Sequence, residues 1–377
     1  MAASSLRDYL DNRGRSAPAP ARAAADPRPA RFHRSMLGYE PSPLAGAPGV
    51  ARHLGLQRLV VKLEVQRFGL PSFKMLGASW AICRALSRRA GRVEPAATFA
   101  ELRELAASQR DVTLVAATDG NHGRAVAHMA RLLGLGAQIL VPEHIAPARI
   151  DAIAGEGADV EVVRGSYDDA VLRSAAAADE RRLVISDTSW PGYEDVPGWI
   201  ADGYATIFDE LAEQLPVVPP LVAVQIGVGA LASAVVRALA PAGPVLVGVE
   251  PADAACTLAA VRAGEPVLVA GPHRSLMAGL NCGLVSQLAL PDMARGISAF
   301  CAIDDRAVEL AVRMLLSDGL ACGETGASGV AGLLALRERW PDTTWERLGL
   351  PDRPAALAIC TEAPTDPASF ARITGSG

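Results

Sequence analysis

The sequence predicts an α/β protein with two doubly wound, mainly parallel sheets, and three observations support this prediction. Short apolar runs of strand length recur along the chain, segments of helix length separate them, and the runs fall into two groups, one before about Leu183 and one after. Strands that alternate with helices form βαβ units, whose parallel sheets are buried on both faces. A ligand of such sheets binds in the crevice at the carboxyl ends of the strands.

The expected strands are the apolar runs themselves. They are Leu59–Val61, Thr113–Ala116, Ile139–Val141, Val160–Val163, Leu183–Ile185, Leu221–Ile226, Val245–Val249 and Ala356–Ile359. Three of the intervening segments are expected to be helices, namely Gly123–Leu135, Ala230–Leu239 and Arg306–Ser317. Residues 1–30 are rich in alanine, proline and arginine, and we expect them to form a flexible N-terminal arm.

The composition is typical of a globular protein that acts on a small molecule. The chain has 377 residues, 50% of them hydrophobic and 20% charged, with a formal net charge of −5 and no long basic run. Neither nucleic acid nor an anionic membrane surface is therefore expected as a partner. No apolar run approaches the roughly 18 residues of a membrane-spanning helix, and the first thirty residues lack the pattern of a secretory signal. A cytoplasmic location is expected.

The six cysteines are scattered, without a CxxC pair or a histidine at the spacing of a zinc ligand. This pattern predicts neither a disulfide framework nor a metal site, and most cysteines are expected to be small core residues.

Lysine is rare in this chain. Of 36 basic residues only Lys62 and Lys74 are lysines. Arginine stays protonated, whereas a lysine amine can lose its proton and attack a carbonyl group. Lys74 stands where a loop enters a helix, beside Phe73 and Met75, and an amine in this setting would be partly desolvated. A nucleophile and an ordinary surface lysine are both compatible with this local pattern.

Two turns between a strand and a helix are candidate anion sites. The turn at Ala117–Arg124 would present backbone N–H groups and the amide of Asn121 to a ligand. Alternatively, Asp119 is only a helix cap there and His122 only a hydrogen-bonded residue. The glycines of the second turn, Gly227–Ala230, would let the backbone close around a phosphate. Since Ala232 replaces the last glycine of GxGxxG and no GK[ST] follows, neither a dinucleotide nor a nucleoside triphosphate is indicated.

Together these motifs resemble the fold-type II pyridoxal phosphate enzymes, relatives of tryptophan synthase β and serine/threonine dehydratase, from about Gly38 to Phe370. Within that superfamily the sequence is similar to the diaminopropionate ammonia-lyases at residues 38–44, 67–74 and 187–194. Asp119 distinguishes the two families most clearly: dehydratases usually have a serine at that position, and diaminopropionate ammonia-lyases have an aspartate.

The resemblance implies a tryptophan synthase β-like fold that binds its cofactor, pyridoxal 5'-phosphate, in a cleft between two domains. The large domain would comprise residues 31–77 and 184–377, and the small domain residues 78–183. A homodimer is implied as well. No metal ion is expected.

The resemblance also implies the roles of individual residues. Lys74 would hold the cofactor as an imine and act as a base; Asp119 and Asp187 are the other catalytic candidates, and Thr118, Asp119, Gly120 and Asp187 would bind the substrate. Asn121 would contact the ring hydroxyl of the cofactor, Thr361 its pyridine nitrogen, and Gly227, Val228, Gly229 and Ala230 its phosphate.

The implied reaction is α,β-elimination from D- or L-2,3-diaminopropionate to pyruvate and two molecules of ammonia through aminoacrylate. Two departures from the family leave alternatives open: Ala363 and Pro364 follow Thr361-Glu362 where a glycine is usual, and the chain is somewhat short. A serine/threonine dehydratase and a specialised β-eliminase or β-replacement enzyme keep the cofactor and change the substrate. A non-catalytic amino-acid or nucleotide-binding protein is the alternative from another class.

Overall fold

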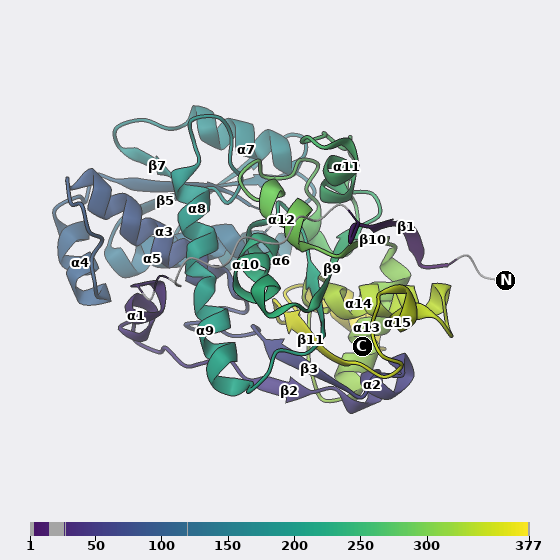
Figure 1. Cartoon of the computed structure of the whole chain (residues 1–377). Helices are drawn as coiled ribbons and strands as arrows, with labels where there is room; N and C mark the ends of the chain where they lie inside the picture. The colour runs from purple at the N-terminus through teal and green to yellow at the C-terminus, as the bar shows by residue number, and fades with distance from the viewer. Residues whose placement is uncertain (1–3, 15–25, 27, 119, 376–377) are drawn as a thin grey trace. The chain divides into compact units, whose positions relative to one another are not determined.

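The computed structural model describes residues 4–14, 26, 28–118 and 120–375 of the chain (Figure 1). These residues divide into two compact units, which are described separately. Unit 1 comprises Met1–Ala23, Ser42–Gln66 and Glu210–Gly377, and unit 2 comprises Ala24–Pro41 and Arg67–Asp209. No helix in the described ranges is long and apolar enough to cross a membrane.

Unit 2 is built around a four-stranded sheet in the order β6-β5-β4-β7, and all its strand pairs are parallel. Its strands are β4 (Thr113–Ala117), β5 (Gly136–Pro142), β6 (Asp159–Val163) and β7 (Arg182–Val184). Its helices are α1 (Arg28–Arg34), α3 (Lys74–Arg89), α4 (Phe99–Ala107), α5 (Asn121–Leu133), α6 (Pro147–Ala154), α7 (Tyr167–Ala176), α8 (Asp195–Gly203) and the beginning of α9 (Ala205–Gln214).

Unit 1 contains a seven-stranded sheet in the order β1-β10-β9-β8-β11-β3-β2, parallel except for the two edge pairs. Its strands are β1 (Leu6–Asp11), β2 (Leu44–Gly46), β3 (Arg58–Leu63), β8 (Leu221–Gln225), β9 (Val245–Pro251), β10 (Ala299–Ile303) and β11 (Ala355–Cys360). Its helices are α2 (Pro48–Leu54), α10 (Ala230–Leu239), α11 (Cys256–Ala263), α12 (Leu290–Gly296), α13 (Asp305–Ser317), α14 (Glu324–Arg339), α15 (Thr344–Arg347), α16 (Pro367–Thr374) and the end of α9.

The core of unit 1 lies between its sheet and α14. This helix packs across β8, β9, β10 and β11, and its first thirteen residues, Glu324–Leu336, are all buried. Small residues let the helix approach the strands closely: a Cβ on Gly332 would lie only 2.3 Å from Cγ2 of Val249, and a Cβ on Gly329 would lie 3.2 Å from the carbonyl oxygen of Ala223. The α/β class and the two mainly parallel sheets are therefore confirmed.

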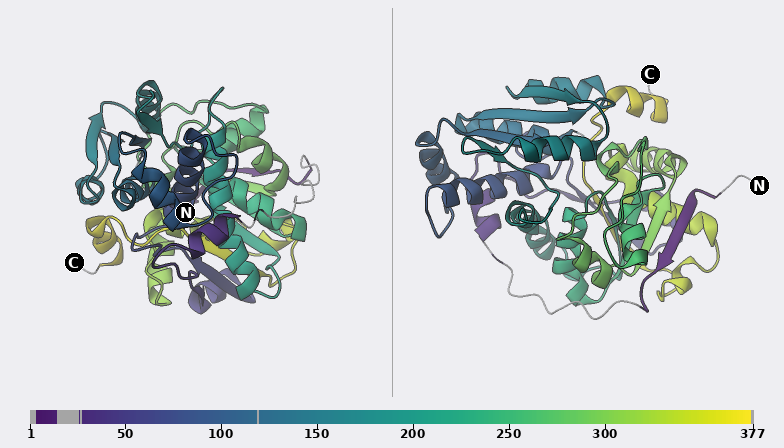
Figure 2. Two further views of the ribbon diagram at one scale, coloured as in Figure 1. Left: turned by 90° about the vertical axis from the view of Figure 1, so that its left-hand side faces the viewer. Right: turned by 90° about the horizontal axis from the view of Figure 1, so that it is seen from above.

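Part of the segment expected to be a flexible arm is a strand. Leu6–Asp11 forms β1 and pairs antiparallel with β10 at the edge of the seven-stranded sheet, which the right panel of Figure 2 shows. The remainder of residues 1–30 lies largely outside the described residues.

The bounds of the units also differ from the expected domains. Unit 2 begins before residue 78 and continues past residue 183 to Asp209. The physical reason is packing onto α3, because both α1 and α8 contact that helix. Helices on either side of the expected small domain thus belong to the same compact unit.

Candidate active site

Lys74 is the first residue of α3, and its side chain is partly buried. The amine lies 5.4 Å from the centre of the Phe73 ring, and 21% of the side chain is exposed. Met75 and Leu76, which follow it, are fully buried. This is the partly desolvated setting that the sequence predicts for a reactive amine.

Lys74 forms an ion pair with Asp187 inside unit 2. The distance from Nζ to Oδ2 is 2.7 Å, and the Tyr167 hydroxyl donates to Oδ1 of the same carboxylate over 3.1 Å. Burial alone would raise the pKa of Asp187, but the charge of Lys74 and the hydrogen bonds from Lys74 and Tyr167 hold it well below its ordinary value. Asp187 is therefore a carboxylate that stays ionised next to the lysine.

The side chain of Thr118 stabilises the turn before α5 by local hydrogen bonds. Its Oγ1 accepts hydrogen bonds from the backbone N–H groups of Gly120 and Gly123 at 2.9 and 3.0 Å. Gly120 has φ +143°, a conformation that favours glycine. Asn121 is the first residue of α5, which begins two residues before the expected start at Gly123. Asp119, the most discriminating residue of the sequence, lies outside the described residues.

His122 is buried beside the ion pair. Its Nε2 lies 2.8 Å from the carbonyl oxygen of Ile185, so Nε2 carries the hydrogen and Nδ1 is an acceptor. Burial, reinforced by the charge of Lys74, lowers the pKa of His122. Within the described part of the chain Nδ1 makes no hydrogen bond. A neutral imidazole with an accepting nitrogen thus belongs to this group, in addition to the hydrogen-bonding role that the sequence indicates.

In unit 1 the glycine turn joins β8 to α10. Gly229 has φ +105°, and a Cβ there would lie 2.5 Å from Cε of Met293. A Cβ on Gly227 would lie 3.0 Å from the carbonyl oxygen of Gly279. Among the described residues no side chain caps the N-terminus of α10, and Val228 and Ala230 are buried. The turn is therefore a tight backbone cradle at a helix N-terminus, which suits a phosphate.

Thr361 directly follows β11 and is buried. Its Oγ1 accepts a hydrogen bond of 2.7 Å from Nε2 of Gln225, which also donates to the carbonyl oxygen of Ile359. Because an amide N–H can only donate, the Thr361 hydroxyl keeps its own hydrogen for another acceptor. A pyridine nitrogen is such an acceptor.

Cysteine pairing differs from the expectation. Cys322 and Cys360 form a disulfide, with their Cα atoms 6.1 Å apart. Cys322 precedes α14 and Cys360 ends β11, so the packing of α14 on β11 brings together two residues that are 38 positions apart. The spacing of the cysteines carries no sign of this pair. Cys83, Cys256, Cys282 and Cys301 are buried, as expected.

Three groups that contact the candidate residues were not predicted from the sequence. Tyr167, Gln225 and the carbonyl of Ile185 act through contacts between segments that are distant along the chain. Tyr167 lies within the capping box that Ser166 and Asp169 form at the start of α7; this motif predicts a helix but no contact with Asp187. No group of metal-ligating side chains occurs among the residues that the structure describes.

The residues present fit pyridoxal phosphate. In unit 2, the Lys74 amine could bond to an aldehyde. In unit 1, the Gly227–Ala230 turn could bind a phosphate, and the Thr361 hydroxyl could donate its hydrogen to a ring nitrogen. The chain belongs to the family of pyridoxal-phosphate dependent enzymes, whose family model matches residues 36–345.

Comparison with individual proteins narrows this class to the diaminopropionate ammonia-lyases. The chain is 34% identical to the diaminopropionate ammonia-lyase of Escherichia coli K12 over 362 residues, which cover 92% of this chain and 90% of the relative. The Salmonella typhimurium enzyme of that name is 33% identical over 367 residues, 92% of this chain and 91% of the relative. The crystal structure of the E. coli enzyme with an aminoacrylate-PLP azomethine reaction intermediate matches with a TM-score of 0.86 and 32% identity, covering 99% of this chain and 98% of that one.

Proposed function

We propose that this protein is a pyridoxal phosphate-dependent lyase that converts D- and L-2,3-diaminopropionate and one water molecule to pyruvate and two ammonia molecules. The observation that carries the proposal is the buried Asp187 carboxylate, held ionised 2.7 Å from the Lys74 amine. The β-substituent that leaves diaminopropionate is an ammonium group, and a fixed carboxylate stabilises such a cation by a charge-assisted hydrogen bond. A serine or threonine hydroxyl has less use for it.

Each candidate residue has a defined task in this proposal. Lys74 binds the cofactor aldehyde and, when released, moves the α-proton of the L-enantiomer. Asp119 removes the α-proton of the D-enantiomer, and Asp187 interacts with the leaving ammonium. The Thr118–Asn121 turn binds the substrate carboxylate, with Asn121 placed against the cofactor ring hydroxyl.

The remaining residues hold the cofactor. The Gly227, Val228, Gly229 and Ala230 turn binds its phosphate through backbone N–H groups, and Thr361 donates to its ring nitrogen. When bound, pyridoxal phosphate supplies an electron sink for the pair left by the α-proton. A hydroxyl partner leaves the ring nitrogen largely unprotonated, which favours elimination over transamination.

The proposed stoichiometry distinguishes this reaction from dehydration. We expect purified holoenzyme to release two ammonia molecules per pyruvate from both enantiomers of diaminopropionate. A serine dehydratase releases one ammonia per pyruvate from serine. Absence of turnover with either enantiomer, together with turnover of serine or threonine, would establish the dehydratase alternative instead.

Asp119→Asn tests the stereochemical assignment. We expect the variant to lose roughly 10²-fold or more of its kcat with the D-enantiomer, the range of a positioned proton-transfer group, and much less with the L-enantiomer. Steady-state kinetics with each enantiomer measure the two losses. Equal losses would contradict the role of Asp119 as a stereospecific base.

The proposal includes a homodimer in the cytoplasm, which the resemblance to the family implies. Light scattering on purified protein measures the mass of the assembly. A mass of a single 39.2 kDa chain would contradict the dimer.

A further inference from the structure

Lys62, the second of the two lysines, is in unit 1 and has no part in the site described above. It lies on β3, and its side chain is 0% exposed. Its amine donates to three oxygens: the backbone carbonyl of Ser42 at 2.8 Å, Oε2 of Glu210 at 2.7 Å and Oε1 of Gln214 at 2.9 Å. A fully buried ammonium with a carboxylate partner is costly to desolvate, so a specific role is expected of it.

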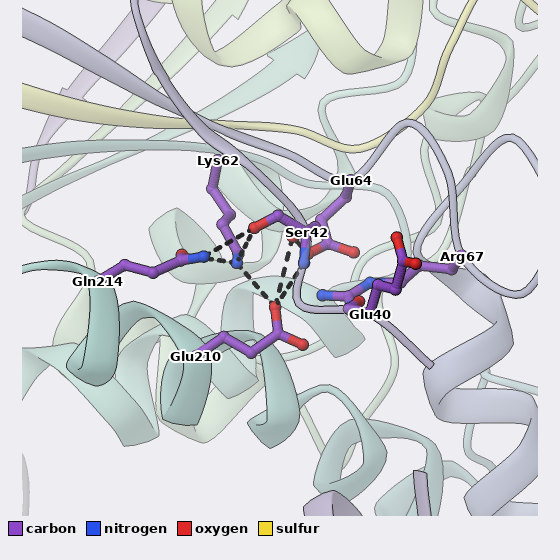
Figure 3. Close-up of polar contacts among 7 residues, drawn as sticks. All are labelled: Glu40, Ser42, Lys62, Glu64, Arg67, Glu210 and Gln214. Carbon is purple, nitrogen blue, oxygen red and sulfur yellow. Dashed lines mark hydrogen bonds and ion pairs between the residues drawn. The ribbon is translucent and has the colours of Figure 1, made fainter. Parts of the chain in front are cut away.

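Ser42 lies at the centre of the same cluster (Figure 3). Its backbone N–H donates to Oε2 of Glu210 over 3.0 Å, and its hydroxyl donates to Oε1 of Glu64 over 2.5 Å. Gln214 also donates to the Ser42 carbonyl, at 2.9 Å. We call these five residues, Ser42, Lys62, Glu64, Glu210 and Gln214, the Lys62 cluster; its side chains are buried or partly buried.

Three residues of the Lys62 cluster lie at or near the points where the chain enters or leaves unit 1. The chain enters the unit at Ser42, leaves it after Gln66 and enters it again at Glu210. Ser42 and Glu210 are thus the first residues after two passages, and Glu64 lies two residues before the third. The bonds of Ser42 to Glu64 and Glu210 therefore tie three passages of the chain together within unit 1.

In unit 2, a hydrogen bond joins the residues next to two of these passages, the one before Ser42 and the one after Gln66. Arg67, of which 2% is exposed, donates from Nη1 to the backbone carbonyl of Glu40 over 3.0 Å. The segment that leads from the end of β3 to Lys74 is therefore held twice, at Glu64 in unit 1 and at Arg67 in unit 2. Between these points and Lys74 it contains Phe68, which has φ +53°, and Gly69, which has φ +80°.

We infer that Lys62 is a positioning residue, which anchors the start of the Lys74 segment through Ser42, Glu64 and Glu210. Its ammonium is compact and directs its hydrogens to three acceptors, whereas the larger planar guanidinium of arginine would not fit a fully buried site built for one nitrogen. This accounts for the retention of lysine at position 62 in a chain that otherwise uses arginine. The effect on catalysis, though not the anchoring, rests on the function proposed above.

Hydrogen–deuterium exchange of the holoenzyme tests the anchoring directly. In Lys62→Met we expect amide exchange to rise at least about tenfold in peptides covering residues 40–44, 64–73 and 209–214, because the cluster is opened locally. Peptides of β9 and α14 should keep the wild-type rate. Glu250→Gln is the matched control, because Glu250 is a buried carboxylate in the same unit outside the cluster.

Two further variants keep the test decisive if Lys62→Met folds poorly. Glu210→Gln removes the negative charge of the Lys62–Glu210 pair and keeps the shape of the side chain. The double variant Lys62→Met with Glu210→Gln removes both charges, so that Glu210 is not left as a buried carboxylate without its lysine partner. We expect both to show the same three-segment pattern, with the double variant closer to wild type in thermal stability than Lys62→Met. Kinetics should show a fall in kcat larger than the change in KM, with the absorbance of bound cofactor retained.

Unchanged exchange in residues 64–73 would overturn the inference, and so would a uniform rise across the whole unit like that of an ordinary destabilised core. If the wild-type protein fails to convert diaminopropionate, the proposed function fails, while the exchange pattern still decides whether Lys62 anchors the segment.

Discussion

At the scale of single residues, each of the two lysines has a carboxylate partner in its own unit. Lys74 pairs with Asp187 in unit 2, where 21% of the lysine side chain remains exposed, and Lys62 pairs with Glu210 in unit 1, fully buried. The accessible amine can meet a ligand, and the inaccessible one can only hold structure. We therefore propose a chemical role for Lys74 and a positioning role for Lys62.

Lys74→Arg tests the chemical role. Arginine keeps the positive charge next to Asp187 but cannot bond covalently to an aldehyde, so we expect turnover to fall by at least about 10⁴-fold. Thermal unfolding of the cofactor-free variant should stay close to wild type, because the ion pair survives. Coupled assay of pyruvate release is the measurement, and near-normal activity would contradict the role of Lys74.

At the scale of elements, the sequence predicts what is periodic and misses what depends on distant partners. All eight expected strands are present, as β3 to β9 and β11, and the three expected helices correspond to α5, α10 and α13. β1 was missed because its sequence, LRDYLD, is charged and only its pairing with β10 makes it a strand. β2 has three residues, too few for a recognisable pattern. The apolar run of β10, Ala299–Ile303, was also missed.

The candidate site shows the same division. Lys74, Asn121 and the Gly227–Ala230 turn lie at the N-termini of helices, where local sequence predicts a change from loop to helix. The partners that tune them are Tyr167 on Asp187 and Gln225 on Thr361, and both bonds join separate elements. Such bonds follow from tertiary packing and leave no local signal.

The carboxyl group of Glu250, which lies on β9 and contacts the start of α11, makes the stability of the protein depend on pH. Its two carboxylate oxygens accept the backbone N–H groups of Thr257 and Leu258 at 2.7 and 2.8 Å, and burial raises the pKa of Glu250 from 4.5 to about 7. The folded protein thus holds this proton more tightly than the unfolded chain, and the contribution of Glu250 to the free energy of unfolding falls as pH rises from about 4.5 to 7.

We expect Glu250→Gln to remove this pH dependence. As the pH rises from 5 to 7.5, the free energy of unfolding of the wild type should fall relative to that of the variant by on the order of a few kcal/mol. Urea denaturation of both proteins at the two pH values measures the change. A difference between them that is independent of pH would show that Glu250 titrates normally.

Gly229→Ala tests the phosphate cradle. Alanine is strained at φ +105° and would crowd Met293, so the turn should distort and its affinity for pyridoxal phosphate fall at least about tenfold. Gly243→Ala is a matched control in the same unit, since Gly243 has φ +80° and an added Cβ would have no atom of the described residues within 4 Å. Cofactor titration followed by absorbance separates them, and equal affinities for the two variants would argue against the cradle.

At the scale of the whole molecule, the chain forms two units with separate sheets, and its side-chain amines are so few that each can be followed individually. With an amine-reactive reagent, the folded cofactor-free protein should be labelled at Lys74 and not at Lys62, which is 0% exposed. In a urea series, labelling of Lys62 should increase only with global unfolding. Peptide mass spectrometry reads both sites, and rapid labelling of Lys62 in the folded protein would contradict its burial.

The central claim is that Lys74 carries pyridoxal phosphate, and reduction with borohydride followed by peptide mapping tests it most directly. Because Lys62 and Lys74 are the only lysines, the outcome is unambiguous. The account predicts a single pyridoxyl group on the peptide that contains Lys74, lost together with activity in Lys74→Arg. A pyridoxyl group on Lys62, or on neither lysine of an enzyme that contains the cofactor, would contradict it.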